Sequence, residues 1–192
     1  MSSADITTCK FIELRVTEDN MGDPKALFSS HLLTPRRNNA QLLIRPLQID
    51  DYDKGLLDVL SQLTQVGTVT REQFQKRFQE WKNAVDTYFI IVVEDTQTKK
   101  VIGCSSLMVE RKTVHNAGKV GHIEDVAIDS GYRGKDLGAK LIFQLKHIAV
   151  QQGCYKVILS CSEKNKPFYE KSGFQQKEVQ MACYFDQVKS KL

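Results

Sequence analysis

The sequence predicts an α/β protein with a mixed, mostly antiparallel sheet flanked by helices. Apolar runs rich in strand-forming residues recur along residues 41–185, and amphipathic segments with helical spacing lie between them. Residues 87–112 form two apolar runs joined by a polar turn, which is typical of a hairpin. The predicted order is strand, two helices, three strands, helix, strand, helix, strand, and it fits helices packed on the faces of one sheet.

The first strand is predicted at residues 41–47, QLLIRPL, a short run rich in strand formers. A helix follows, because Asp50 offers an N-cap and leucines recur at helical spacing after it. Thr70 and Gln73 match a capping box, which predicts the start of a second helix. The apolar stripe of that helix is interpreted as core packing: Phe74, Phe78, Trp81 and Val85.

After the hairpin, the segment VGHIEDVAI predicts a strand at residues 120–128. The next helix is expected to end near Gly153. A compact strand is predicted at residues 155–161, a short helix at 165–174 and a last strand at 176–185. The face that the long helix buries is predicted from Leu137, Leu141, Ile142, Leu145, Ile148 and Ala149.

The composition of the chain limits the classes of protein to which it can belong. The chain has 192 residues, 27 basic and 23 acidic, and this mild excess does not indicate nucleic-acid binding. No apolar run is long enough to span a membrane, and we expect a cytoplasmic protein without a signal peptide. We divide the chain into a weakly structured N-terminal extension, residues 1–40, in which short pieces can dock on the body, and one domain, residues 41–192.

The cysteines predict neither disulfides nor a metal site. They are five in number, widely spaced, and form no CxxC pair: Cys9, Cys104, Cys154, Cys161 and Cys183. This usage fits reduced thiols. A nucleophilic cysteine would need an activating base, and no suitable histidine pattern accompanies Cys154 or Cys161.

The turn RGKDLG between the strand at 120–128 and the long helix predicts an anion site. A helix N-terminus presents unpaired N–H groups and the positive end of the helix dipole. Glycines allow a ligand to approach the backbone closely, and basic side chains add charge. The alternative is a solvated basic turn, and the stretch taken alone leaves the two interpretations even. Neither a GxxxxGK[ST] nor a GxGxxG motif occurs.

The position of this turn, between a strand and a helix, and its residue pattern together resemble those of a known superfamily. Residues 133–138 resemble the pyrophosphate-binding motif [QR]xxGx[GA] of the GNAT N-acetyltransferases, with Asp136 where that superfamily most often has glycine. The resemblance extends from about residue 42 to 185 and includes the order of elements. The segments LTQVGTVT, VERKTVHNAGKVGHIEDVAI, GCYKVILSC and NKPFYEKSGF are similar to those of the glucosamine 6-phosphate N-acetyltransferases within it.

The resemblance implies acetyl-CoA as the co-substrate and no metal. It implies that the strand before the turn splays from its neighbour and pairs with the pantetheine arm, and that an N–H there, that of Val126 for instance, polarises the thioester carbonyl. The implied contacts of acetyl-CoA are Val126, Ala127, Ile128, Arg133, Gly134, Lys135, Asp136, Leu137, Gly138, Ala139, Asn165, Tyr169 and Lys171.

For the reaction itself, the resemblance places Tyr169 near the sulfur as the acid for the leaving thiolate, although a core tyrosine beside Phe168 is the alternative. Glu124 and Asp125 are adjacent on a strand, so we expect them on opposite faces, one of them in the cleft, where it orients the amine. The implied substrate contacts are Thr64, Lys112, Thr113, Val114, His115, Glu124, Asp125, Tyr155 and Lys156.

One departure keeps other functions open. The resemblance implies a last-strand arginine that reaches the substrate phosphate across a homodimer, but the segment MACYFDQVKSKL contains none, and Tyr184 and Phe185 stand near that position. The leading hypothesis is acetyl transfer to the amine of D-glucosamine 6-phosphate, on the route to UDP-N-acetylglucosamine. The alternatives are an acetyltransferase acting on another amine, such as a polyamine or a protein N-terminus, and a weakly active CoA-binding paralogue.

Overall fold

The computed structural model of the chain describes residues 23–34 and 41–184. The chain divides into a large unit that ends at Leu159 and a small unit that begins at Ser160. The strands of the large unit are β1 (Leu42–Pro46), β2 (Tyr88–Asp95), β3 (Lys100–Arg111), β4 (Lys119–Ile128) and β5 (Cys154–Ile158). Its helices are α1 (Leu56–Ser61), α2 (Arg71–Asn83), α3 (Val114–Ala117) and α4 (Leu137–Gln151). Its short 3₁₀ helices are Ser30–Leu32, Ile49–Tyr52 and Ser130–Tyr132.

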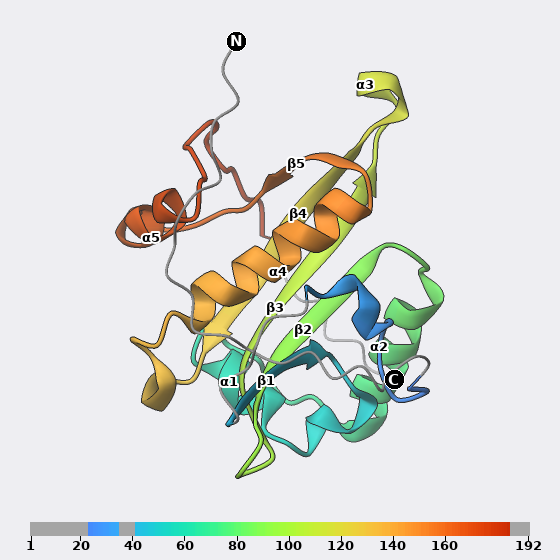
Figure 1. Cartoon of the computed structure of the whole chain (residues 1–192), viewed down its shortest axis with the longest axis vertical. Helices are drawn as coiled ribbons and strands as arrows, with labels where there is room; N and C mark the ends of the chain where they lie inside the picture. The colour runs from blue at the N-terminus through green and yellow to red at the C-terminus, as the bar shows by residue number, and fades with distance from the viewer. Residues whose placement is uncertain (1–22, 35–40, 185–192) are drawn as a thin grey trace. The chain divides into compact units, whose positions relative to one another are not determined.

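The strands form one five-stranded sheet in the order β1-β2-β3-β4-β5. The first four strands pair antiparallel, and β4 pairs with β5 in parallel. Figure 1 shows α4, which connects these two parallel strands, lying along the sheet. The predicted fold class, a mixed and mostly antiparallel sheet flanked by helices, is therefore confirmed.

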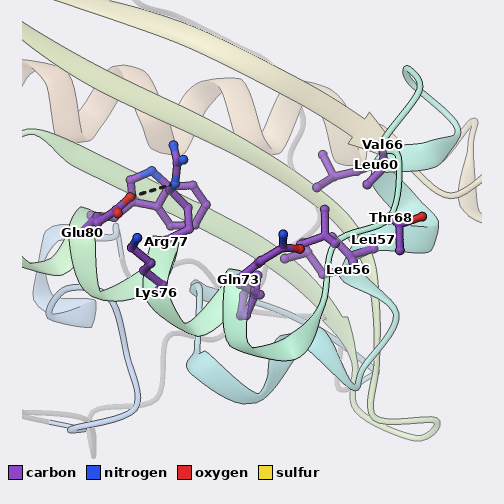
Figure 2. Close-up of a pocket in the computed structure, with 12 residues that line it drawn as sticks. Leu56, Leu57, Leu60, Val66, Thr68, Gln73, Lys76, Arg77 and Glu80 are labelled. Atoms are coloured by element: carbon purple, nitrogen blue, oxygen red, sulfur yellow. Dashed lines mark ion pairs between the residues drawn. The ribbon is translucent and has the colours of Figure 1, made fainter. Parts of the chain in front are cut away.

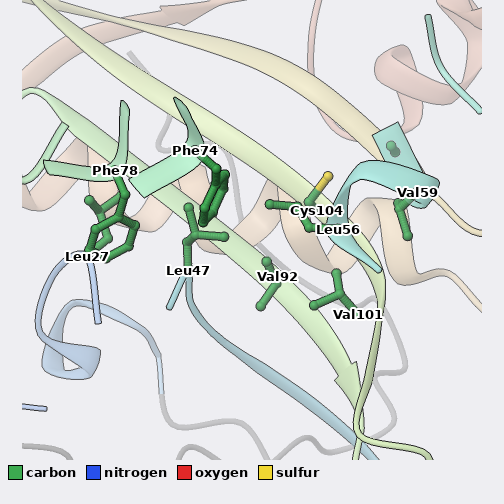
Figure 3. Close-up of a cluster of buried hydrophobic side chains, with 10 residues drawn as sticks. Leu27, Leu47, Leu56, Val59, Phe74, Phe78, Val92, Val101 and Cys104 are labelled. Carbon is green, nitrogen blue, oxygen red and sulfur yellow. The ribbon is translucent and has the colours of Figure 1, made fainter. Parts of the chain in front are cut away.

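One face of the sheet is covered by α1 and α2. The capping box predicted at the start of α2 is present, with Thr70 accepting from the Gln73 N–H and Gln73 accepting from the Thr70 N–H. The stripe of α2 is buried at Phe74 and Phe78, but Val85 lies beyond the end of the helix and is 70% exposed. Figure 3 shows the resulting core, which comprises Leu27, Leu47, Leu56, Val59, Phe74, Phe78, Val92, Val101, Cys104 and Ala127.

The stripe predicted for α4 is buried throughout. Gly121 of β4 is the point of closest approach, because a Cβ there would lie 3.5 Å from the Cβ of Ala149 and 2.8 Å from Leu107 Cδ1. The helix also holds the N-terminal region. The amide of Gln144 accepts from the Thr34 N–H at 2.9 Å and donates to the Thr34 hydroxyl at 2.8 Å.

Residues 23–34, which lie within the expected N-terminal extension, therefore pack on the domain. Leu27 belongs to the core beneath α1 and α2, and Leu33 is 3% exposed. The backbone of Leu27 is hydrogen-bonded to that of Leu47. The rest of the expected extension, residues 1–22 and 35–40, lies outside the described residues.

The small unit contains the 3₁₀ helix Glu163–Asn165 and the helix α5 (Lys166–Lys171). The prediction of a strand at residues 176–185 was wrong for the described part, because residues 174–184 form neither helix nor strand. Val179, Met181 and Tyr184 are 85%, 92% and 93% exposed. The pattern of a strand is present, but a strand also needs a neighbour that supplies hydrogen bonds and a surface to bury against, and the described small unit offers none.

Candidate active site

The turn that ends β4 is built to present backbone amides. Gly134 has a φ of +78°, and Asp136 occupies the N-cap position of α4 with a φ of +55°. The Lys140 N–H bonds to the Asp136 carbonyl at 3.1 Å, so the N–H groups of residues 137–139 lie ahead of this first helical bond. A Cβ at Gly134 would meet no protein atom within 4 Å. The amides, the helix dipole, Arg133 and the open side of the turn all fit a bound pyrophosphate.

The strand that leads into this turn has one open edge. Pairing of β4 with β5 extends only from Lys119 to His122, so residues 123–128 have no partner on that side in the described chain. An extended ligand can therefore add to this edge through main-chain hydrogen bonds. This is the splayed strand that the sequence resemblance implied, with Val126, Ala127 and Ile128 along it.

A β-bulge lies at the centre of the open stretch. The register between β3 and β4 shifts between Cys104 and Ser106, opposite Asp125, which has a left-handed φ of +54°. The Glu124 carbonyl is held by two hydroxyl donors of β3, Ser105 Oγ at 3.1 Å and Ser106 Oγ at 3.3 Å. These serines were missed by the sequence analysis, although a Ser-Ser pair inside an apolar strand was a visible signal.

The bulge affects the alternation on which we based our expectation for the two acidic residues. Glu124 and Asp125 are both exposed. The strict alternation of a strand holds only while every residue is extended, and the left-handed Asp125 breaks it. Partial desolvation, followed by the Asp125 carboxylate, raises the pKa of Glu124, while His122 acts in the opposite direction. The raised pKa marks a carboxyl held against its charged form, as is frequent in active sites.

A row of three interacting ionisable side chains extends along β3 and β4 away from the bulge. His122 Nε2 lies 2.9 Å from Glu110 Oε2, and Lys112 Nζ donates to Glu110 Oε1 at 2.6 Å. These contacts lower the pKa of Glu110, with the Lys112 hydrogen bond as the largest cause. The contact of His122 with Glu110 places it beside the expected substrate residue Lys112.

The connection from β3 to β4 gathers most of the other expected substrate residues. Thr113 is the N-cap of α3, Val114 begins it, and His115 has a φ of +53°. The His115 ring lies 4.5 Å from that of Tyr155 on β5, and Lys156 Nζ lies 5.8 Å from the same Tyr155 ring. Lys112, Thr113, Val114, His115, Tyr155 and Lys156 are thus brought to one end of the sheet.

Thr64 lies at the opposite end of β4. It follows α1, and Gln62, the C-cap of α1, bonds to Asp129 directly after β4. Figure 1 shows α3 and α1 at opposite ends of β3 and β4. β4 has ten residues, which corresponds to about 30 Å. Within one chain, the expected substrate residues are therefore divided between two places.

The small unit carries Asn165, Tyr169 and Lys171. The Tyr169 ring packs edge-on against Phe168, with centroids 4.9 Å apart, and against Phe174 at 6.1 Å. Asn165 occupies the N-cap position of α5, but its side chain makes no capping hydrogen bond. Lys171 is the exposed last residue of α5.

A separate groove lies between α1 and α2 and has a volume of about 550 Å³. Figure 2 shows its apolar floor with Leu56 and Leu60, and a charged rim with Lys76, Arg77 and Glu80. Its lining includes none of the predicted site residues. In the described residues, no group of three or more His, Cys, Asp and Glu side chains is placed to hold a metal ion. No helix of the described chain is long and apolar enough to cross a membrane.

Comparison with known proteins agrees with this geometry. The model of the acetyltransferase (GNAT) family matches residues 56–174. Glucosamine 6-phosphate N-acetyltransferase 1 of Dictyostelium discoideum is 54% identical over 140 residues, which cover 73% of this chain and 88% of that protein. The corresponding enzyme of Arabidopsis thaliana is 48% identical and is covered over 96% of its length. The crystal structure of the Arabidopsis thaliana enzyme superimposes with a TM-score of 0.74, covering 76% of this chain and 99% of that one. With a family model that matches more than half of its length and relatives of this identity, the chain belongs to the acetyltransferase (GNAT) family.

Proposed function

We propose that this chain transfers the acetyl group of acetyl-CoA to the amine of D-glucosamine 6-phosphate, which gives N-acetyl-D-glucosamine 6-phosphate for the synthesis of UDP-N-acetylglucosamine. The observation that carries the proposal is the open edge of β4 from Ile123 to Ile128, which is followed, after the short 3₁₀ helix Ser130–Tyr132, by an amide-rich turn. The relatives at 48–54% identity are named for this reaction.

In this proposal the large unit holds the acyl donor. The amides of residues 134–139, with Arg133 and Lys135, bind the pyrophosphate, and the backbone of Val126, Ala127 and Ile128 pairs with the pantetheine arm. This places the thioester beside the bulge. A main-chain N–H released from the ladder at Val126 donates to the thioester oxygen and stabilises the charge that develops there.

The acyl transfer is direct. The neutral amine nitrogen of the sugar forms a bond to the carbonyl carbon, the C–S bond breaks, and the nitrogen loses one proton to water. The departing thiolate takes a proton from an acid, which water then reprotonates. Glu124 and Asp125, both exposed at the bulge, orient the amine. Tyr169 gives its proton to the thiolate, because a phenol is a competent acid toward sulfur. Asn165 and Lys171 add contacts to acetyl-CoA in the same small unit.

The sugar phosphate is held by cations and polar groups. Lys112, His115 and Lys156 supply positive charge and ring N–H donors, while Thr113, Val114 and Tyr155 shape the site beside them. Thr64 contacts the sugar from the α1–α2 connection. Since Thr64 lies about one strand length from that cluster within a single chain, we propose a homodimer in which a second copy completes the sugar site. We also propose a cytoplasmic location, in keeping with the free thiols of Cys104, Cys154, Cys161 and Cys183.

The decisive assay is CoA release with a panel of amines. Glucosamine 6-phosphate should show a kcat/KM at least about tenfold above that of unphosphorylated glucosamine, since a charge-assisted contact to phosphate contributes about 1.5–3 kcal/mol. Equal kcat/KM values for the two sugars would argue against a phosphate site and would favour another amine as the substrate. The absence of the last-strand arginine leaves this alternative open.

The homodimer is tested separately. Light scattering coupled to size exclusion should give twice the mass of one chain. At glucosamine 6-phosphate concentrations below the KM, Gly134→Val and Lys112→Met should each impair activity. Mixed dimers of the two chains should regain part of it, since one of their two sites then combines an intact turn with an intact Lys112. A monomer with full activity would contradict the shared site.

A further inference from the structure

Two side chains outside the motif fasten the turn of residues 133–136 to the rest of the domain. The first is Tyr132, directly before the turn. Its hydroxyl donates to Asp95 Oδ2 at 2.7 Å, at the end of β2. Asp95 is 1% exposed, and hydrogen bonds from a hydroxyl to a buried carboxylate are among the stronger ones.

Asp95 is itself rigidly held. Its Oδ1 accepts from the backbone N–H groups of Gln97 at 2.9 Å and Thr98 at 3.2 Å in the β2–β3 connection. The hydrogen bond from Tyr132 is the largest of the causes that lower the pKa of Asp95. The hydroxyl of Tyr132 is therefore tied to a fixed point of the sheet.

The second side chain is Gln62, which approaches from α1. Its Nε2 donates to Asp129 Oδ2 at 2.8 Å, and its Oε1 accepts from the Ser130 N–H at 2.8 Å. Asp129 in turn accepts from the Gly131 N–H at 2.9 Å. One amide group thus links the end of α1 to the first two residues after β4, which precede the turn.

Tyr132 also carries a group of the motif. Lys135 Nζ lies 4.8 Å from the centre of the Tyr132 ring, within the range of a cation–π contact. A lysine side chain has several rotatable bonds, and this contact restricts where its charge can lie. The hydroxyl of Tyr132 thus ties the start of the turn to Asp95, and its ring restrains Lys135.

We propose that Tyr132 and Gln62 are positioning residues of the acetyl-CoA site: they fix the pyrophosphate-binding turn, and Lys135 with it, before the ligand arrives. The proposal rests on the proposed binding of the pyrophosphate at this turn. Its physical basis is preorganisation, because a turn that is already ordered loses less conformational entropy on binding. Neither residue touches the reacting atoms, so the effect should fall on affinity for acetyl-CoA and not on kcat.

The test compares two acyl donors in the full-length chain. Tyr132→Phe removes one hydroxyl and leaves the Asp95 carboxylate with its backbone donors, so the variant should fold. Gln62 is exposed, and Gln62→Ala tests the same support without disturbing a buried group. Each variant should raise the Kd and the KM for acetyl-CoA about three- to tenfold, as expected for one or two lost hydrogen bonds. The kcat should stay within about twofold of the wild type.

The second donor, S-acetylpantetheine, lacks the pyrophosphate. Its kcat/KM should be unchanged in both variants, since the turn has nothing to bind. Equal losses with both donors would overturn the proposal, because they would indicate a general structural defect. An unchanged Kd for acetyl-CoA in both variants would overturn it as well.

Two controls separate the inference from the site on which it depends. Gln65→Ala changes another exposed glutamine of the same connection and should leave both donors unaffected. Gly134→Val alters the turn directly. If it leaves acetyl-CoA affinity unchanged, the proposed pyrophosphate site itself fails. If Gly134→Val weakens acetyl-CoA binding but Tyr132→Phe and Gln62→Ala do not, the site stands and the positioning role is refuted.

Discussion

Asp136 brings a negative charge into the turn that we propose binds a pyrophosphate, so removal of that charge should tighten the binding of acetyl-CoA. The residue lies at the N-cap of α4 with φ +55° and ψ +19°, and its side chain makes no capping hydrogen bond. Glycine adopts this left-handed conformation without steric cost, and Asp and Asn tolerate it better than other residues. The backbone geometry therefore does not require the carboxylate, while its charge opposes the ligand.

The size of the effect follows from Coulomb's law. Phosphate oxygens at hydrogen-bond distance from the amides would lie roughly 6–8 Å from the carboxylate, and at an effective dielectric constant of about 40–80 each pair of charges repels by about 0.5–1.4 kcal/mol. Physiological salt screens this by about half. Two phosphate charges then give roughly 0.5–1.4 kcal/mol, or about a two- to tenfold lower Kd. Loss of the favourable interaction with the helix dipole should lower the stability of Asp136→Asn by about 0.3–1 kcal/mol.

Calorimetric titration with CoA should show tighter binding for both Asp136→Asn and Asp136→Gly, and the gain should shrink in high salt. Asp86 offers a matched control, because it is exposed and left-handed with a φ of +55° but lies between α2 and β2. Asp86→Asn makes the same change in charge. It should alter CoA affinity no more than a change of one unit in the net charge of the protein does. An unchanged or weaker affinity in both Asp136 variants would show that the carboxylate does not face the ligand, and the electrostatic argument for this turn would be refuted.

Four further outcomes are expected. Tyr169→Phe keeps the ring packing of α5 and should lower kcat roughly ten- to ten-thousandfold; full kcat in steady-state assays would leave it a packing residue only. Replacing Lys112 or Lys156 with Met should raise the KM for glucosamine 6-phosphate about ten- to a hundredfold and spare the unphosphorylated sugar; equal effects on both sugars would contradict a phosphate contact. The raised pKa of Glu124 means that the folded chain holds this proton more tightly than the unfolded chain, so its contribution to stability falls as pH rises from the ordinary pKa through the raised one. Glu124→Gln should therefore flatten the pH dependence of denaturant midpoints across that window while it lowers kcat/KM, and an unaltered pH profile would argue against the shift. Gly121→Ala would place a Cβ 2.8 Å and 3.0 Å from two side chains and should cost about 1–3 kcal/mol in urea unfolding; a neutral result would mean that these side chains yield freely.

Local interactions explain why much of the site could be predicted. The capping box of α2 and the turn at Gly134 depend on residues a few positions apart, so their residue types are visible in the sequence. The amphipathic face of α4 is equally local, since its period matches the helix and every expected position is buried. These features locate the turn that we propose binds the pyrophosphate, without any knowledge of the tertiary structure.

The bulge at Asp125 could not be predicted in the same way. Its left-handed backbone is coupled to two hydroxyl groups that come from another strand, about twenty positions earlier in the sequence. A rule of strict alternation has no means of detecting such a partner. The same limit applies to Leu27, whose burial depends on α1 and α2, and to residues 176–184, whose strand pattern lacks a partner in the described small unit.

The order of groups along β4 gives this single strand several tasks in the proposed reaction. Its first four residues pair with β5, which gathers Tyr155 and Lys156 near Lys112 and His115. In the proposed dimer, this cluster holds the phosphate in the site of the second copy. Beyond the end of the pairing with β5, both acidic residues are exposed at the bulge, where we propose that the amine lies. The remaining open edge can receive the pantetheine arm, and the turn that follows can receive the pyrophosphate. A shift of one residue in the β3–β4 register would move the acidic residues relative to both ends, so the serines that hold the bulge control the alignment of amine and thioester.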